Sequence, residues 1–376
     1  MDFGTTHTGI AYSYSTDPDP SKINLVANWP VARRGHGKES RDKVPTEISY
    51  ETKPEPWGYM LKAGAPRQAW FKLLLDPEAG EVKYNVDAGN PNAVMELPAG
   101  KTVVNVCADY LRIVYNHTIK ILEKRFPGLG RVPIKFVITT PAMWGVNAQH
   151  MTQLAAEQAG FDSRPGDWLD IVTEPEAAAA YVLKNLNARE QQMQRYGIGA
   201  SRGASPSEKS EAWSGCDDFS DSSSTISSTS SLEKHLKDSE TIVTCRANTQ
   251  VIVCDAGGGT VDLVAYEITK LSPFRVKETA QAKGGLCGAT ALDRDFLRLV
   301  KTKLGAQVDL LEKNSKRTGR DSVIMESWES AKEAFSPYHY KDVIIEHDLW
   351  DIIEDEKNGI TDTELIFTQR VPSFAL

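Results

Sequence analysis

The sequence lacks the features of secreted, cysteine-rich and membrane-spanning proteins. Its 376 residues include only five cysteines, which are scattered and show no C-x-x-C spacing. This argues against a disulfide framework and against a cysteine metal site. No apolar run reaches the roughly 20 residues that span a bilayer. Asp2 follows Met1 directly, so no signal peptide is expected. These absences predict a reducing, cytoplasmic setting without membrane contact.

An excess of positive charge is also missing. The formal net charge is −8, so the chain offers no overall basic surface to a nucleic-acid backbone, and no nucleic-acid partner is expected. Hydrophobic residues make up 40% and charged residues 25%, which is ordinary for a globular protein. The length allows two domains or one large two-lobed domain.

The most informative stretch runs from Val251 to Ile268. An apolar run, Val251–Cys254, predicts a buried strand that ends at Asp255. A glycine turn follows, and the alternation of Val261, Leu263 and Ala265 with more polar residues predicts a second strand. The turn and its flanks carry Asp255, Gly257, Gly258, Gly259, Thr260 and Asp262.

Such a hairpin suits a phosphate chain carrying Mg²⁺. Glycines allow a tight turn whose N–H groups face an anion, Thr260 adds a hydroxyl, and the aspartates place carboxylates beside it. The alternative is an ordinary glycine-rich hairpin, because a motif by itself is only a hypothesis.

The N-terminal stretch repeats this pattern of acid, glycine and hydroxyl before a strand expected at 10–14. Its residues are Asp2, Gly4, Thr5, Thr6 and Gly9. Two such hairpins from two lobes can hold a phosphate chain from both sides. No apolar strand precedes Asp2 in the sequence, since only Met1 stands there.

Lys72 lies in the apolar segment Gln68–Leu75. Its stem could lie along an apolar surface with the ammonium group in water. It could instead point into a functional cleft. The sequence leaves both interpretations open.

Periodicity and turn residues predict the remaining elements. We expect helices at 102–124, 150–160, 177–186, 293–304 and 323–335, and strands at 48–50, 134–140, 169–172, 274–280 and 343–346. Another glycine turn is expected at Gly284, Gly285 and Gly288, and no element in the last dozen residues.

Residues 187–245 change in character. Ser214 to Ser231 is half serine, without apolar periodicity, which predicts a disordered insertion. The expected organisation is a first lobe with the crossover at 1–186, the insertion at 187–245, and a second lobe at 246–376 that is truncated at its C-terminal end.

Five motifs, in order and spacing, resemble the nucleotide-binding domain of the 70-kDa heat-shock protein family. They are MDFGTTHTG, VITTPAMWG, TEPEAAAAY, CDAGGGTVDL and KGGLCGATALDRDF, and WESAKEAF resembles the adenosine-contacting helix of that family. The similarity spans Asp2 to about Thr363. The tryptophan-rich style and the serine insertion resemble the divergent heat-shock-70-like proteins that are frequent in filamentous fungi.

The resemblance implies an α/β, actin-like ATPase fold, with two lobes of β-sheet and flanking helices around ATP or ADP. It implies that Asp2 and Asp255 hold Mg²⁺ through water and that Lys72, Glu174, Asp255 and Asp262 act in hydrolysis. The implied nucleotide contacts are Gly4, Thr5, Thr6, Gly257, Gly258, Gly259, Thr260, Gly284, Gly285, Glu329, Lys332 and Ser336. Co-chaperones or protein clients would be partners.

The sequence departs from the family pattern at three places. No strand precedes Asp2, Glu333 stands where the family has an arginine that stacks on adenine, and the closing Gly-Gly motif expected after residue 370 is missing. The chain as written is therefore expected to bind ATP weakly and to hydrolyse it poorly.

Three functions are consistent with these residues. The first is an ATP-hydrolysing chaperone-type domain. The second is a nucleotide-binding scaffold or regulatory protein without turnover. The third, ranked last because no acceptor pocket can be located, is a small-molecule kinase of the same superfamily.

Overall fold

A computed structural model describes most of the chain outside the serine-rich segment. The described residues are 1–15, 22–31, 42–62, 65–76, 97–182, 247–271, 274–312, 322–335, 342–349 and 351–368. The expected insertion at 187–245, the end of the helix expected at 177–186, and Ser336 lie outside them. Among the described residues, no helix combines the length and apolar character needed to cross a membrane.

The chain divides into two compact units. The first comprises Met1–Ala178, Ile252–Ala265 and Ala280–Leu376, and the second comprises Ala179–Val251 and Tyr266–Thr279. All of the described candidate site residues fall in the first unit, which is therefore the one that positions the site.

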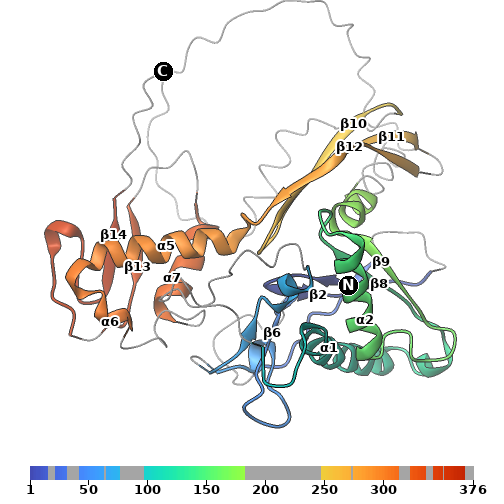
Figure 1. The fold of residues 1–376 in the computed structure, drawn as a ribbon, viewed down its shortest axis with the longest axis horizontal. Coiled ribbons are helices and arrows are strands. Elements are labelled where there is room, and N and C mark those ends of the chain that lie inside the picture. The colour runs from blue at the N-terminus through green and yellow to red at the C-terminus, as the bar shows by residue number, and fades with distance from the viewer. Residues whose placement is uncertain are drawn as a thin grey trace, which may run out of the picture. The chain divides into compact units, whose positions relative to one another are not determined.

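Short antiparallel strands form the N-terminal part of the first unit (Figure 1). A three-stranded sheet has the order β1-β2-β5, in which Asp2 pairs with Gly9 and Thr8 pairs with Val44. The strands are β1 (Asp2–Phe3), β2 (His7–Gly9), β3 (Ala11–Tyr12), β4 (Asn24–Leu25), β5 (Lys43–Pro45), β6 (Glu47–Ile48) and β7 (Gln68–Ala69). Of the strand expected at 10–14, only Ala11–Tyr12 forms a strand, β3, and Asp2 itself lies in β1.

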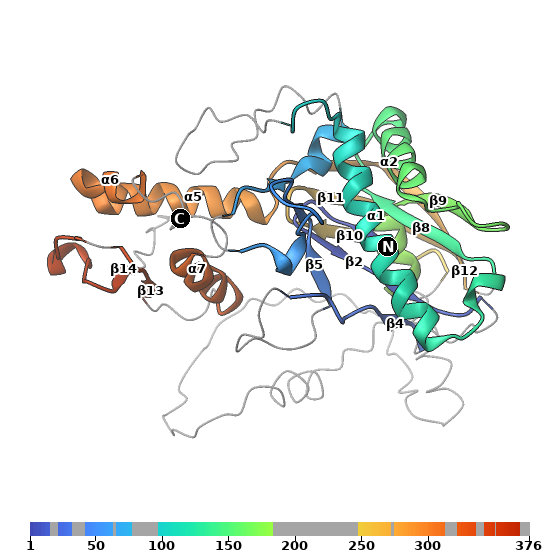
Figure 2. The ribbon, with the colours of Figure 1, turned by 90° about the horizontal axis from the view of Figure 1, so that it is seen from below.

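Two helices and a parallel strand pair complete this region. Helix α1 (Val103–Arg125) begins with a capping box between Thr102 and Asn105. Helix α2 (Val146–Ala159) ends at Gly160, whose φ of 103° fits the expected C-terminal glycine. The two helices lie side by side (Figures 1 and 2). Strands β8 (Lys135–Thr140) and β9 (Trp168–Thr173) pair in parallel.

The core of this region confirms the apolar stripe of α1. Cys107, Tyr110, Leu111 and Val114 are fully buried along it. The ring of Tyr110 packs against Phe3, with centroids 6.3 Å apart, so the helix rests directly on β1. This contact fixes the strand that carries Asp2.

A second core cluster lies in the C-terminal part of the chain. Its elements are α5 (Ala289–Leu304), α6 (Asp309–Glu312), α7 (Val323–Glu333), β13 (Val343–Glu346) and β14 (Glu364–Phe367). Helix α7 packs against β13, which pairs with β14 in antiparallel register (Figure 1). The expectation of no element after residue 364 is therefore wrong. The strand gains its ladder from β13, a long-range partner that local pattern does not reveal.

A third sheet contains β10 (Gln250–Ala256), β11 (Val261–Leu271) and β12 (Phe274–Gly285), in that order. The run Val251–Cys254 forms a strand as expected, but it is not buried, because Ile252 is 75% exposed and Cys254 is also exposed. On β11 the buried apolar residues are Val264, Tyr266 and Ile268, whereas Leu263 on the other face is 43% exposed. Both faces of β11 are apolar in sequence, so period two by itself does not identify the inner one.

Strand β12 extends five residues beyond the predicted end, so Gly284 and Gly285 belong to a strand rather than a turn. A Cβ on Gly284 would lie 2.6 Å from Asp262 Oδ1 and 2.8 Å from the carbonyl oxygen of Val261. Glycine is therefore needed for a close cross-strand approach. The turn itself follows at residues 286–288.

Candidate functional site

The two glycine–hydroxyl hairpins lie against each other in the first unit. A Cβ on Gly258 would overlap the side chain of Thr6, and a Cβ on Gly259 would lie 2.8 Å from the Thr5 hydroxyl. Both threonines follow β1, and both glycines follow β10. Backbone and hydroxyl groups from the two repeats of the sequence pattern thus line one place.

Threonine hydroxyls hold the first hairpin in position. Thr46 donates its hydroxyl proton to the carbonyl oxygen of Gly4 at 2.9 Å, and its backbone N–H donates to the carbonyl oxygen of Thr6 at 2.8 Å. The Thr8 and Thr46 hydroxyls are 2.9 Å apart and buried. The turn that carries Thr5 and Thr6 is therefore fixed by β5 and the residue after it.

Helix α5 holds the second hairpin. The N–H groups of Gly288, Ala289 and Thr290 donate to the carbonyl oxygens of the glycine turn 257–259, at 3.2, 3.0 and 2.9 Å. These bonds satisfy the first amides of the helix, which have no intrahelical partner. They also turn the carbonyls toward α5, while the N–H groups of Gly258 and Gly259 have no partner in the described chain.

Lys72 lies inside the protein, so the interpretation of an ammonium group in water is wrong. Its side chain is 1% exposed, and its Nζ donates to Glu174 Oε1 at 2.7 Å. The Nζ also lies 5.3 Å from the ring centroid of Trp144 and 5.7 Å from that of Phe3. Residues 71–75 form a 3₁₀ helix that packs on α1 and delivers this lysine.

Glu174 occupies the first turn of a helix that covers residues 174–182. Thr173 caps this helix by accepting the N–H of Glu176 at 3.3 Å. Burial raises the pKa of the Glu174 carboxyl, the Lys72 charge opposes the rise, and the charges of Asp2 and Asp255 add to it. The glutamate is therefore partnered by one cation and repelled by two acids.

The two aspartates of the second hairpin are similarly crowded. Burial raises the pKa of Asp255, and the charges of Asp2 and Asp262 raise it further. Burial also raises the pKa of Asp262, with Glu174 adding to the rise, while the Thr260 hydroxyl and the Met143 N–H oppose it. The carboxylates of Asp2, Glu174, Asp255 and Asp262 therefore interact at one site, where Lys43 and Lys72 provide the opposing positive charge.

The Asp262 carboxylate is the least satisfied group at the site. The residue is 1% exposed, yet neither carboxylate oxygen makes a well-formed hydrogen bond within the described chain. The Thr260 and Met143 donors lie close enough to favour its charged form but not in bonding geometry. Buried carboxylates ordinarily have partners, so this oxygen pair fits a cation, a water or a ligand hydroxyl.

Sequence reasoning missed Lys43. This lysine lies on β5 opposite Gly9, and its Nζ contacts Asp2 Oδ2 at 2.6 Å. Both side chains are about half exposed, and the charge of Lys43 partly opposes the rise in the pKa of Asp255 that burial and Asp2 cause. In the sequence, Lys43 is only a lysine next to an apolar residue in a short strand. This pattern is too common to identify a site residue.

The residues expected to meet adenosine form a network on α7. Lys332 Nζ donates to Glu329 Oε1 and to Asp293 Oδ1, both at 2.7 Å. Trp328 donates its indole N–H to the same Asp293 oxygen at 2.8 Å. Burial lowers the pKa of Lys332, but the hydrogen bonds to Asp293 and Glu329 outweigh burial and raise it. Glu333 is exposed.

Helix α5 connects this network to the glycine turn. Asp293 lies on the same helix whose first N–H groups donate to the turn 257–259. Among the described residues, Glu329 and Lys332 form no hydrogen bond or ion pair with the two hairpins. The structure thus brings together the hairpins, Lys72, Glu174 and the three aspartates. Glu329 and Lys332 lie on α7, where Lys332 bonds to Asp293, about one helical turn into α5.

The donor set can be tested against Mg²⁺. The described residues contain no group of three His, Cys, Asp or Glu side chains in metal-ligating geometry. Mg²⁺ in nucleotide enzymes keeps several waters and is held by one or two carboxylates together with phosphate oxygens. Crowded carboxylates with raised pKa values, and unpartnered Asp262 oxygens, fit such a hydrated ion.

Comparison with known proteins gives relatives at low identity. No protein-family model matches the chain. The chain is 28% identical over 358 residues to human heat shock 70 kDa protein 12A, covering 90% of this chain and 50% of that protein. It is 27% identical over 317 residues to human heat shock 70 kDa protein 12B, covering 80% of this chain and 44% of that protein. The mouse 12A protein is 27% identical over 358 residues.

These relatives support the resemblance seen in the motifs at the level of the 70-kDa heat-shock family. The fold is α/β, of the actin-like ATPase class. The chain spans about half the length of the curated relatives that it matches.

Proposed function

We propose that this chain is a nucleotide-binding domain that binds ATP with Mg²⁺ and hydrolyses it, in a protein of the heat-shock-70-like type. The observation that carries the proposal is the meeting of the two hairpins, where Gly258 packs on Thr6 beside Asp255. N–H groups and hydroxyls from both hairpins suit a polyphosphate, and the carboxylates suit its metal ion.

Each residue then has a distinct role. The N–H groups of Gly258 and Gly259 and the hydroxyls of Thr5 and Thr6 hold the phosphate oxygens. Asp2 and Asp255 would hold Mg²⁺ through water, and the ion would supply charge neutralisation of the phosphates when bound. The turn carbonyls are already bonded to α5, so the N–H groups do not need to reorganise on binding.

Lys72 and Glu174 are placed for the hydrolytic step. Water attacks the terminal phosphorus, the new P–O bond forms as the bond to the bridging oxygen breaks, and ADP leaves with the electron pair. Glu174 accepts a proton of the attacking water, for which its raised pKa is suited, and Asp262 orients that water. Lys72 stabilises charge on the transferring group.

A second candidate is nucleotide binding without turnover. One observation favours it: Lys332 already donates to both Asp293 and Glu329, so a nucleoside would have to share these partners. Exposed Glu333 offers no guanidinium for stacking on a base. Weak adenosine contacts would lower affinity while the phosphate site remains.

Asp255→Asn separates the two candidates. The glycine amides survive this change, while the charge that faces the metal does not. We expect phosphate release from Mg-ATP to fall by roughly 100-fold, as for loss of one preorganised electrostatic group, with ATP affinity changed only a few-fold. Calorimetry and a phosphate-release assay measure the two quantities, and exposed Glu354→Gln is the control.

Three results would decide the matter differently. Equal losses in binding and turnover would make Asp255 structural. Binding without phosphate release in the unmodified chain would favour the second candidate. Release of a phosphorylated acceptor instead of inorganic phosphate would favour a small-molecule kinase.

Chaperone activity, co-chaperone or client partners, a cytoplasmic location and the divergent type frequent in filamentous fungi are further parts of this proposal. They rest on the motif resemblance and on the low-identity relatives. Gly284, Gly285 and Ser336 remain proposed nucleotide contacts, of which Ser336 lies outside the described residues.

A further inference from the structure

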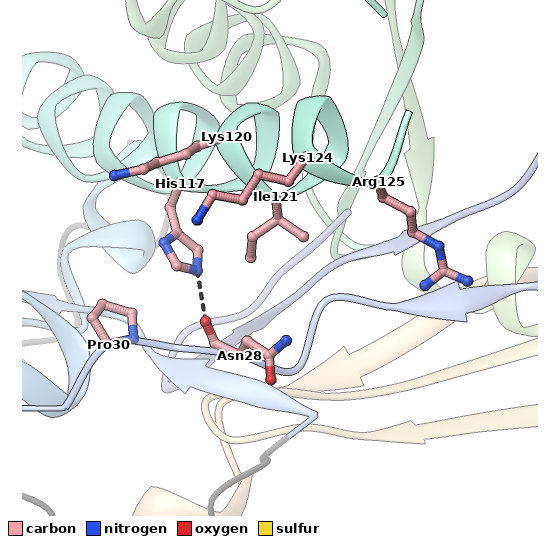
Figure 3. A pocket seen from close by; sticks show the side chains of 7 residues that line it. All are labelled: Asn28, Pro30, His117, Lys120, Ile121, Lys124 and Arg125. Atoms are coloured by element: carbon pink, nitrogen blue, oxygen red, sulfur yellow. Dashed lines mark hydrogen bonds between the residues drawn. The ribbon is translucent and has the colours of Figure 1, made fainter. Parts of the chain in front are cut away.

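A second concave site lies between helix α1 and the segment at 28–30. The pocket has a volume of about 640 Å³, within the range typical of small-molecule sites. Figure 3 shows its seven lining residues, which are Asn28, Pro30, His117, Lys120, Ile121, Lys124 and Arg125. It shares no residue with the two phosphate hairpins.

The charge of this pocket is of one sign. Lys120, Lys124 and Arg125 line it, and none of its described lining residues is a carboxylate. Lys120 and Lys124 are exposed, one helical turn apart on the same face of α1, and neither forms an ion pair in the described chain. Like charges at this spacing repel each other. An anion between them would convert this repulsion into attraction.

Two walls of the pocket are held rigidly by other contacts. Arg125 donates to Asn24 Oδ1 at 3.1 Å, and its guanidinium lies 5.6 Å from the Tyr12 ring centroid. His117 donates its Nε2–H to the carbonyl oxygen of Asn28 at 2.9 Å and stacks on Trp29 at 5.4 Å. The cation and the imidazole are therefore preorganised, which lowers the entropy lost when a ligand binds.

The chemistry of these groups selects the ligand class. A guanidinium offers a planar fork of donors to phosphate oxygens, and lysines offer strong point charges. Ile121 and Pro30 add an apolar surface for the body of a ligand. Because the whole chain carries a net charge of −8, anions are not attracted to it in general. We propose that this pocket binds a small molecule carrying at least two phosphate groups.

The test uses inorganic pyrophosphate as the probe and the His117 ring as a local reporter. The NMR proton–carbon cross-peak of the His117 ring is assigned by its absence from the spectrum of the His117→Gln variant. We expect pyrophosphate, added at constant ionic strength, to shift this resonance saturably, at sub-millimolar concentration. Lys120→Ala with Lys124→Ala should weaken the binding at least tenfold, and Lys124→Glu should abolish the shift. Both lysines are exposed, so the helix should retain its circular dichroism.

A matched control removes two exposed lysines elsewhere, Lys277→Ala with Lys357→Ala, and should leave the shift unchanged. Pyrophosphate that binds by calorimetry without moving the His117 resonance would place binding at the hairpins alone and overturn the proposal. So would an equal shift with acetate at the same ionic strength, or a shift that survives loss of both pocket lysines.

Discussion

The Nζ of Lys72 and the Oε1 of Glu174 are 2.7 Å apart, and the lysine side chain is 1% exposed. These residues are separated by 102 positions in the chain. The pair joins the 3₁₀ helix at 71–75 to the start of the helix at 174–182. Removing one partner of this ion pair leaves the other charge buried without compensation. The effects of substituting Lys72 and Glu174 on stability should therefore not be additive.

Lys72→Met should therefore destabilise the fold more than the double variant Lys72→Met with Glu174→Gln. Removing one partner of a buried ion pair costs about 3–5 kcal/mol, because the other charge is left without compensation. The double variant removes both charges and should recover part of this loss. Urea unfolding at pH 8 measures the free energies.

The control for this cycle is Lys135→Met, which breaks the exposed ion pair with Asp170. An exposed pair contributes about 0–1 kcal/mol. If Lys72→Met lowers the free energy of unfolding no more than Lys135→Met does, then the ammonium group of Lys72 is solvated. The description of a buried ion pair would then be wrong.

The contribution of three site carboxyl groups to stability should fall as the pH rises through the acid range. Glu174, Asp255 and Asp262 have pKa values raised above their ordinary 4.5, 3.8 and 3.8. A carboxyl group with a raised pKa binds its proton more tightly in the folded state. Its stabilising effect is complete below the ordinary pKa and is lost as the pH passes the raised one. Urea unfolding without Mg²⁺ or nucleotide, at intervals from pH 3.5 to pH 8, measures this.

In Asp255→Asn the same pH dependence should be shallower. The variant should also be more stable than the unmodified chain at pH 8, because asparagine removes a partly buried charge that Asp2 and Asp262 repel. Glu354→Gln, at an exposed position, should leave the profile unchanged. A steeper profile in Asp255→Asn would contradict the carboxylate crowding.

Gly258→Ala should open the contact between the two hairpins. The added methyl group would overlap Thr6, so one hairpin must move, at a cost of about 1–3 kcal/mol as for overpacking. Thr6→Gly, combined with it, should restore part of the thermal stability. Gly130→Ala is the control, because a Cβ there meets no atom within 4 Å. Equal melting temperatures for Gly258→Ala and Gly130→Ala would show that the hairpins are apart.

The Trp328 indole has two separable contributions. It stacks on Phe296, with centroids 4.3 Å apart and planes at 4°, and it donates to Asp293. Trp328→Phe keeps a ring but loses the donor, so it should cost about 1 kcal/mol. Trp328→Ala loses both and should cost about 3–5 kcal/mol. Differential scanning calorimetry checks the order, with exposed Trp168→Phe as the control, and equal costs would contradict the stack.

The sequence predicted elements well where a local signal was strong. The stripe of α1 and the C-terminal glycine of α2 were found because 3.6-residue periodicity and a positive φ are local properties. The hairpin residues were singled out because acid, glycine and hydroxyl occur twice in the same order. What that repeat could not give was the packing of Gly258 on Thr6, which depends on two distant segments.

The failures concern long-range partners. Strand β14 was missed because its signal is the ladder with β13, and the buried face of β11 could not be identified because both of its faces are apolar. Gly284 was placed in a turn because its reason, the Asp262 carboxylate across the strand, is not visible in sequence. Lys43 was missed because its partner Asp2 is 41 positions away.

The attachment of helix α5 to the glycine turn allows α5 to transmit a movement of that turn over a distance. Its first N–H groups are fastened to the glycine turn 257–259, and its 16 residues extend about 24 Å at 1.5 Å per residue. A rotation of about 10° at the fastened end would carry the far end about 4 Å, since displacement grows with distance from the pivot. A sub-ångström movement of the glycine turn that rotates the helix would therefore produce a larger displacement at the C-terminal end of α5.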